Sequence, residues 1–204
     1  MSAKARFSFR ELGEAAQDAA RCRLLDKMEN LPWHEKATAQ FVVDAGKVGV
    51  NVIPGSVRFS KDSASFSASD VNLPVVLDYS GIGEKFLSAP EDFDLFCAYA
   101  MAEIRQVYPD SPNAQLLSVS VEMDSLYNLD GGRVGAVCDV AADHLERYLK
   151  NLAMTLAVHL HELLSAEHER MASRNFLDGI LETMGAVFTD KGAWEASISL
   201  DGYR

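Results

Sequence analysis

Six side chains able to bind a metal ion or move a proton crowd into one short stretch, HLHELLSAEHE, residues 159–169. The stretch holds three histidines and three glutamates, and these are residue types that coordinate zinc or serve as general acids and bases. Apolar residues recur around it at helical spacing, so the question is which side chains one helix could bring to a point. The spacing decides whether this is an active site.

That spacing argues against a metal centre. His161 and His168 share a helix face but are seven positions apart, which is about 10 Å of helical rise. His159 and Glu162 are three apart and could both reach one ion, but two ligands from one helix make half of a site. The HExxH motif of zinc proteases and the Glu-x-x-His pairs of di-iron bundles are absent. We therefore expect a solvated helix end with His159 beside the core, with no catalytic residue, metal ligand or cofactor.

Two other motifs have weak chemical signals. DYSGIGEKF, residues 78–86, imitates a dinucleotide-binding loop, but Phe86 stands where the third glycine belongs and no helical pattern follows directly, so we expect a surface turn. Cys22 lies between Arg21 and Arg23, which could lower the pKa of its thiol, but it also falls beside the apolar side of a helix. G-x-S-x-G and P-loop motifs are absent.

The net charge of −11 is concentrated in the middle of the chain. Residues 62–130 hold twelve acidic side chains and two basic ones. Such a surface repels phosphate backbones, which disfavours direct binding to nucleic acid, and it attracts a basic partner. A net negative surface that simply keeps a protein in solution is the alternative reading.

Seven acidic residues are the candidates for a partner-binding surface. Some lie where a helix is expected to begin, and there a favourable interaction with the helix dipole could by itself account for the presence of carboxylates. Others lie near an expected hairpin, and a continuous surface would suit an inhibitor that imitates DNA, although the acidic density is modest. The seven are Glu91, Asp92, Asp94, Asp110, Glu122, Asp124 and Asp130.

The N-terminal part predicts a helical hairpin. Ser8 and Glu11 form an S-x-x-E capping box, and apolar residues follow at helical spacing as far as Met28. Pro32 ends this run, and a second helix is expected over residues 33–44 with Gly46 as its stop.

From residue 48 the hydrophobic period changes to two, which predicts an antiparallel β-meander through LPVVLDY, residues 73–79. A helix is expected from Pro90 to Val107, and a hairpin around LDGG that pairs the strands LLSVSVEMDSLYN and RVGAVCDV. The longest helix is expected over residues 141–172, with a leucine stripe against which the sheet packs. Ser173 caps a last helix through Met184, before a small terminal hairpin.

These elements predict a single α+β domain spanning residues 1–204. It consists of the N-terminal helical hairpin and an antiparallel β-meander sheet packed against the long C-terminal helix. The three cysteines form no CxxC pair, and no apolar run is long enough to cross a bilayer. We therefore expect a cytoplasmic protein that does not bind a membrane.

Three segments together resemble a family of uncharacterised accessory proteins encoded by bacteriophages and prophages. They are FSFRELGEAAQDAARCR, VRFSKDSASF and VFTDKGAW, residues 7–23, 57–66 and 187–194. Members are similar in having a helix that begins F-x-E-L-x-x-x-A, a strand ending in a serine-rich ASF segment, and an FTxxG tail. Many carry a Q-G-D-G run before ASF, whereas this chain has Lys61-Asp62-Ser63. The resemblance implies a setting in the infected bacterial cell, and some relatives are labelled antitoxin-like.

The sequence thus predicts a non-enzymatic phage accessory protein that binds a host or defence-system protein with a basic surface, as an inhibitor or counter-defence factor. The alternative is a ligand- or metal-binding enzyme with a pocket between the sheet and the long helix, using His159 and Glu162. Self-assembly is a third possibility, and the sequence does not indicate an oligomeric state.

Overall fold

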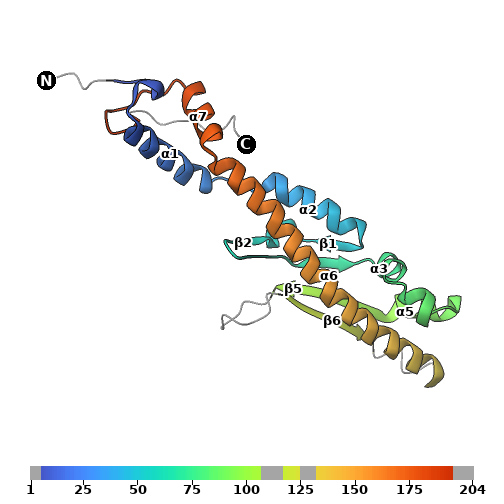
Figure 1. The fold of residues 1–204 in the computed structure, drawn as a ribbon. Coiled ribbons are helices and arrows are strands. Elements are labelled where there is room, and N and C mark those ends of the chain that lie inside the picture. Colours follow the sequence, from blue (N-terminus) through green and yellow to red (C-terminus); the bar gives the residue numbers. More distant parts are fainter. Residues whose placement is uncertain (1–5, 107–116, 125–131, 195–204) are drawn as a thin grey trace. The chain divides into compact units, whose positions relative to one another are not determined.

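The computed structural model describes residues 6–106, 117–124 and 132–194, with side chains from residue 136 onward in the last range. It has the α+β class predicted from the sequence, with a long helix, α6 (Gly132–Ala172), packed against small antiparallel sheets (Figure 1). By its internal contacts the chain divides into two compact units. Unit 1 comprises residues 1–36 and 165–204, and unit 2 comprises residues 37–164. The single domain stays a prediction.

Unit 1 is helical. It contains the 3-10 turn η1 (Phe9–Glu11), α1 (Glu14–Glu29), the end of α6, and α7 (Arg174–Thr183). The predicted capping box forms, with the Ser8 N–H donating to the Glu11 carboxylate at 2.8 Å, but it caps η1, and α1 begins only after Gly13. The predicted cap of the last helix is confirmed, because the Ser173 hydroxyl accepts a hydrogen bond from the Phe176 N–H.

The core of unit 1 joins both ends of the chain. Phe188 is fully buried and bridges to Phe7 on one side and to Trp194 on the other, which confirms the terminal hairpin. Gly192 closes the turn with a φ of 69°, a backbone conformation that glycine adopts without strain. The buried apolar residues of this core come from η1, α1, α6, α7 and the tail: Phe9, Leu12, Ala20, Leu24, Met28, Met171, Leu177, Ile180, Leu181 and Phe188.

Unit 2 combines short strands with helices. Along the chain it contains α2 (Glu35–Lys47), β1 (Val50–Val52), η2 (Pro54–Ser56), β2 (Arg58–Ser60), β3 (Ser63–Ser65), β4 (Ala68–Val71), α3 (Leu73–Ser80), α4 (Ile82–Phe86), α5 (Pro90–Tyr99), β5 (Ala100–Gln106), β6 (Leu117–Met123) and most of α6. Helix α2 passes through Gly46, which was predicted to stop it. The helix ends at Lys47, and the glycine with a positive φ that follows it is Gly49, at 83°.

The strands of unit 2 form three two-stranded antiparallel ladders, β1–β4, β2–β3 and β5–β6. The predicted meander is therefore wrong at LPVVLDY, which is helix α3. The Asn72 side chain accepts from the Val75 N–H, and a proline lies in the first turn, both of which favour a helix start. Leu73, Val76 and Leu77 are then buried at helical spacing.

Two further predictions in unit 2 were wrong at element boundaries. The helix from Pro90 ends at Tyr99, and β5 follows, because residues 100–106 alternate between buried Ala100 and Ile104 and an exposed face. The segment RVGAVCDV is the start of α6, where Cys138 and Ala141 are buried at helical spacing. The predicted LDGG turn lies outside the described residues apart from Gly132, the first residue of α6.

The leucine stripe of α6 packs within unit 2 at four of the six predicted positions, whereas Leu152 and Leu163 are half-buried. Leu145, Leu149 and Leu160 are fully buried, and Leu156 nearly so. The same core holds Phe41 from α2 and Phe66 from the β3–β4 connection, whose rings meet edge to face with centroids 5.2 Å apart. This arrangement places one side of α6 on the sheets and leaves its other side exposed.

Candidate functional site

The three histidines of the HLHELLSAEHE stretch each contact a different segment. Within unit 2, the His159 Nε2 lies 3.3 Å from the Asp44 carboxylate of α2, and the His161 Nε2 lies 3.1 Å from the Lys61 carbonyl in the β2–β3 turn. Within unit 1, the His168 Nε2 lies 3.2 Å from the Glu29 carboxylate. An imidazole N–H can donate to each of these acceptors, so the histidines connect α6 to its neighbours.

The geometry around these histidines offers no chelating cluster. Among the residues that the structure describes, no group of three or more His, Cys, Asp or Glu side chains could hold a metal ion. His159 is half-exposed beside the ring of Phe41, as expected for a residue that borders the core. Glu162 faces solvent, and Glu167 pairs with Arg170 at 2.6 Å.

The glycine-rich stretch at residues 78–86 differs from the expected surface turn. Gly81, with a φ of 67°, separates α3 from α4, so a short helix does follow it. Gly83 is buried, and a Cβ added there would lie 3.2 Å from the Phe93 ring. This glycine therefore permits close packing between α4 and α5. Cys22, which was expected at the core or its boundary, is exposed.

The acidic candidates occupy two elements of unit 2. Glu91 and Asp92 lie in the first turn of α5, as predicted, followed by Asp94 one position after Phe93. Glu122 lies on β6 with its side chain exposed, and Asp124 follows that strand, its N–H donating to the Tyr99 carbonyl at 2.9 Å. Asp110 and Asp130 lie outside the described residues. Whether these carboxylates form one surface stays a prediction.

The outer face of the β5–β6 ladder combines acidic and apolar side chains. Met101 is 57% exposed and is the register partner of Glu122. Glu103 is exposed on the same face and pairs with Arg105 at 2.7 Å. An exposed methionine is flexible enough to adapt its shape to different contacts.

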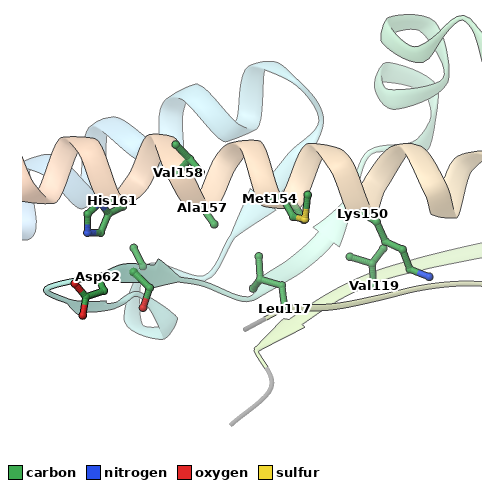
Figure 2. Close-up of a pocket in the computed structure, with 11 residues that line it drawn as sticks. Asp62, Leu117, Val119, Lys150, Met154, Ala157, Val158 and His161 are labelled. Carbon is green, nitrogen blue, oxygen red and sulfur yellow. The ribbon is translucent and has the colours of Figure 1, made fainter. Parts of the chain in front are cut away.

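An apolar groove lies between α6 and two strands of unit 2 (Figure 2). Its volume is about 470 Å³, within the range of small-molecule and peptide pockets. Leu117 and Val119 of β6 line one part of the groove, and Ser63 and Ala64 of β3 line another part. Helix α6 covers the groove. The α6 residues at the groove are Lys150, Ala153, Met154, Ala157, Val158 and His161, with Asp62 in the β2–β3 turn.

Sequence reasoning predicted a pocket between sheet and helix but not its residues. Met154 and Val158, both 59% exposed, lie off the leucine stripe, one helical turn apart. Their spacing was the available signal, because two large apolar residues on the side of a helix away from its core stripe indicate a contact surface. His161 lines the groove, whereas His159 and Glu162, the residues favoured for a pocket, do not.

Among the described residues no helix is both long enough and apolar enough to cross a bilayer. Comparison with protein-family models, with curated proteins and with solved structures finds no match for this chain.

Proposed function

We propose that this chain is a non-enzymatic bacteriophage accessory protein that binds a basic host or defence-system protein through unit 2. Its place of action is the cytoplasm of the infected bacterium, and its effect on the partner is inhibition. The setting comes from the resemblance of three sequence segments to phage accessory proteins. The mode of action comes from the charge and shape of unit 2.

One observation carries the proposal, namely the uneven charge of the two units. Residues 37–164 contain 17 of the 30 acidic side chains and 8 of the 19 basic ones. Unit 2 therefore holds a charge of −9, against −2 for the rest of the chain. Complementary charge speeds association and selects against wrong partners, while an exposed apolar residue such as Met101 supplies contact energy.

The test is charge reversal on the proposed surface with a matched control in the same unit. Glu91→Lys combined with Glu122→Lys should abolish capture of a host protein from bacterial lysate by the full-length chain. Asp139→Lys combined with Asp143→Lys makes the same charge change at exposed positions of α6 and should retain capture. Capture by the unaltered chain should weaken as salt is raised, because exposed charge pairs are screened.

Equal capture by both pairs of variants would refute the acidic surface. Loss of capture in both would show that only total charge matters, and this outcome also contradicts a defined docking surface. Far-UV circular dichroism on all variants verifies that folding is retained.

A second function, ligand binding in the groove under α6, is favoured by the pocket itself. Its lining is mainly apolar, with Asp62, Ser63, Lys150 and His161 as polar groups that an organic molecule could contact. Native mass spectrometry of the purified chain should then show a stoichiometric organic adduct, lost in Ala157→Trp. Elemental analysis, together with unaltered behaviour of His159→Ala, would exclude the metal version.

A further inference from the structure

Within the part of the chain that the structure describes, strand β6 has one paired edge and one open edge, and the β5–β6 register identifies which residues serve each. The Asp124 N–H donates to the Tyr99 carbonyl, and this pair continues the β5–β6 register. In an antiparallel ladder, hydrogen-bonded pairs alternate with pairs whose N–H and C=O groups point away. Leu117, Val119 and Val121, at the odd positions, therefore direct their backbone groups to the edge opposite β5.

That open edge faces α6. The Glu146 carboxylate on α6 lies beside the Val121 N–H, which helps to lower the pKa of Glu146, and its side chain covers the edge at that point. Glu146 also forms an ion pair with Lys150, and this pair is the main cause of its lowered pKa. Beyond Val121 the edge continues to Val119 and Leu117, where the apolar groove begins. Among the described residues no strand pairs with β6 there.

The open edge and the groove thus share the same residues. Backbone groups with no strand to pair with lie beside an apolar space that is covered by Met154 and Ala157. A small apolar molecule would fill the space but would leave the N–H and C=O groups of the strand without partners. An extended peptide satisfies both, since its backbone bonds the edge and every second side chain enters the groove.

We propose that the open edge of β6 at Leu117–Val119 binds an extended segment of the partner protein as an added strand, with an apolar side chain in the groove under α6. This inference rests on the proposed function and specifies how the basic partner is recognised. Side chains on the other face of the added strand lie on the same side of the sheet as Glu122. The segment recognised therefore alternates apolar residues with lysine or arginine.

The probe is a bead-displayed library of random peptides of about twelve residues, long enough to extend past a short strand edge. It is screened against the full-length chain, and the Kd values of enriched peptides are measured by fluorescence anisotropy. Enriched peptides should share apolar residues at every second position with basic residues between them. N-methylation of alternate backbone amides should weaken binding in one register and not in the other.

Two pairs of variants test the edge and the groove separately. Leu117→Pro removes an N–H that points to the open edge, at the first residue of the strand, where proline is tolerated. This variant should weaken peptide binding about tenfold. Its control, Leu117→Val, keeps the N–H and should bind the peptide nearly as well as the unaltered chain. Met154→Lys places a charge in the groove and should abolish binding. Val140→Lys makes the same kind of change at an exposed α6 position outside the groove lining and should leave binding unaltered.

The outcomes separate this inference from the proposed function. Suppose that capture of the host protein is lost in Glu91→Lys with Glu122→Lys but retained in Leu117→Pro and in Met154→Lys. That result would overturn the added strand and would still support the acidic surface. A library without enriched peptides, or peptides with helical spacing of their apolar residues, also overturns it. If Leu117→Pro fails to fold, the N-methylated peptides remove the same bonds from the other side.

Discussion

The ion pair between Arg21 and Asp178 is the most informative place to perturb unit 1. The Arg21 guanidinium contacts both Asp178 oxygens, at 2.5 and 2.9 Å, and also the Asp18 carboxylate at 2.5 Å. Only 10% of the Arg21 side chain and 27% of the Asp178 side chain are exposed. The pair joins α1 to α7, which are 157 positions apart in the sequence. We predict that Arg21→Met destabilises unit 1.

The expected loss follows from this partial burial. Breaking a fully buried ion pair costs about 3–5 kcal/mol, and an exposed one costs about 0.5 kcal/mol. Because Asp178 keeps access to water, its carboxylate is rehydrated when the arginine is removed. The expected decrease in the free energy of unfolding is therefore that of a lost charge-assisted hydrogen bond, about 2 kcal/mol. Replacing both partners, in Arg21→Met with Asp178→Leu, should be less destabilising than the single change.

The assay uses the two tryptophans of the chain, Trp33 and Trp194, which both belong to unit 1. Tryptophan fluorescence during urea unfolding therefore reports on that unit, while far-UV circular dichroism reports on the whole chain. Arg21→Met should lower the fluorescence midpoint by about 1 M urea. A dichroism transition that shifts less than the fluorescence transition would show that unit 2 unfolds separately.

The matched control is Arg174→Met, because the Arg174 side chain is 60% exposed and pairs with Asp18 at 3.2 Å. That change should cost no more than about 0.5 kcal/mol. If Arg21→Met and Arg174→Met lower the midpoint equally, burial does not strengthen the pair and the reasoning is refuted. A double variant that is less stable than Arg21→Met would contradict the predicted coupling.

Two further predictions concern a titrating carboxylate and a tight backbone contact. Hydrogen bonding, chiefly from Lys47, lowers the pKa of Asp44 from 3.8 to about 2. The ionised Asp44 carboxylate therefore contributes fully to stability above pH 3.8, and this contribution is lost as the pH falls toward 2. Asp44→Asn should flatten the acid side of a plot of unfolding midpoint against pH, and an unaltered slope would contradict this. In unit 1, a Cβ at Gly192 would clash with the Ala16 carbonyl oxygen, whereas one at Gly185 meets nothing within 4 Å, although both residues have positive φ. Gly185→Ala should cost about 1 kcal/mol and Gly192→Ala about 3 kcal/mol or more, measured by tryptophan fluorescence, and equal losses would show that the contact with α1 does not matter.

Local signals predicted the helices well where they carried their own start and stop. Ser173 before an amphipathic run was sufficient to place α7, and the leucine stripe was sufficient to place the buried side of α6. The same reasoning failed at LPVVLDY and at residues 100–106, where apolar residues are dense enough to suit both a strand and a helix. At LPVVLDY the local Asn72 cap decided for a helix. At residues 100–106 the pairing of β5 with β6 decided for a strand, and pairing with a distant segment leaves no local signal.

The candidate site was predictable in part. The spacing of His159, His161 and His168 predicted that their side chains do not converge, and the structure brings each to a different partner. The carboxylates at Glu91 and Asp92 were correctly placed at a helix start. The sequence could not show which strand edge stays open, because that depends on which strands pair.

By itself, the sequence determined the α+β class, the concentration of negative charge in the middle of the chain, and the absence of a chelating spacing in the histidine-rich helix. These properties depend on composition and on short periodicities, which are local. Only the tertiary structure decided that Leu117 and Val119 line a groove with Met154, and that the backbone edge of β6 opens beside it. Contacts of this kind join residues more than thirty positions apart, and they exist only once the strands have paired and α6 has packed on the sheets.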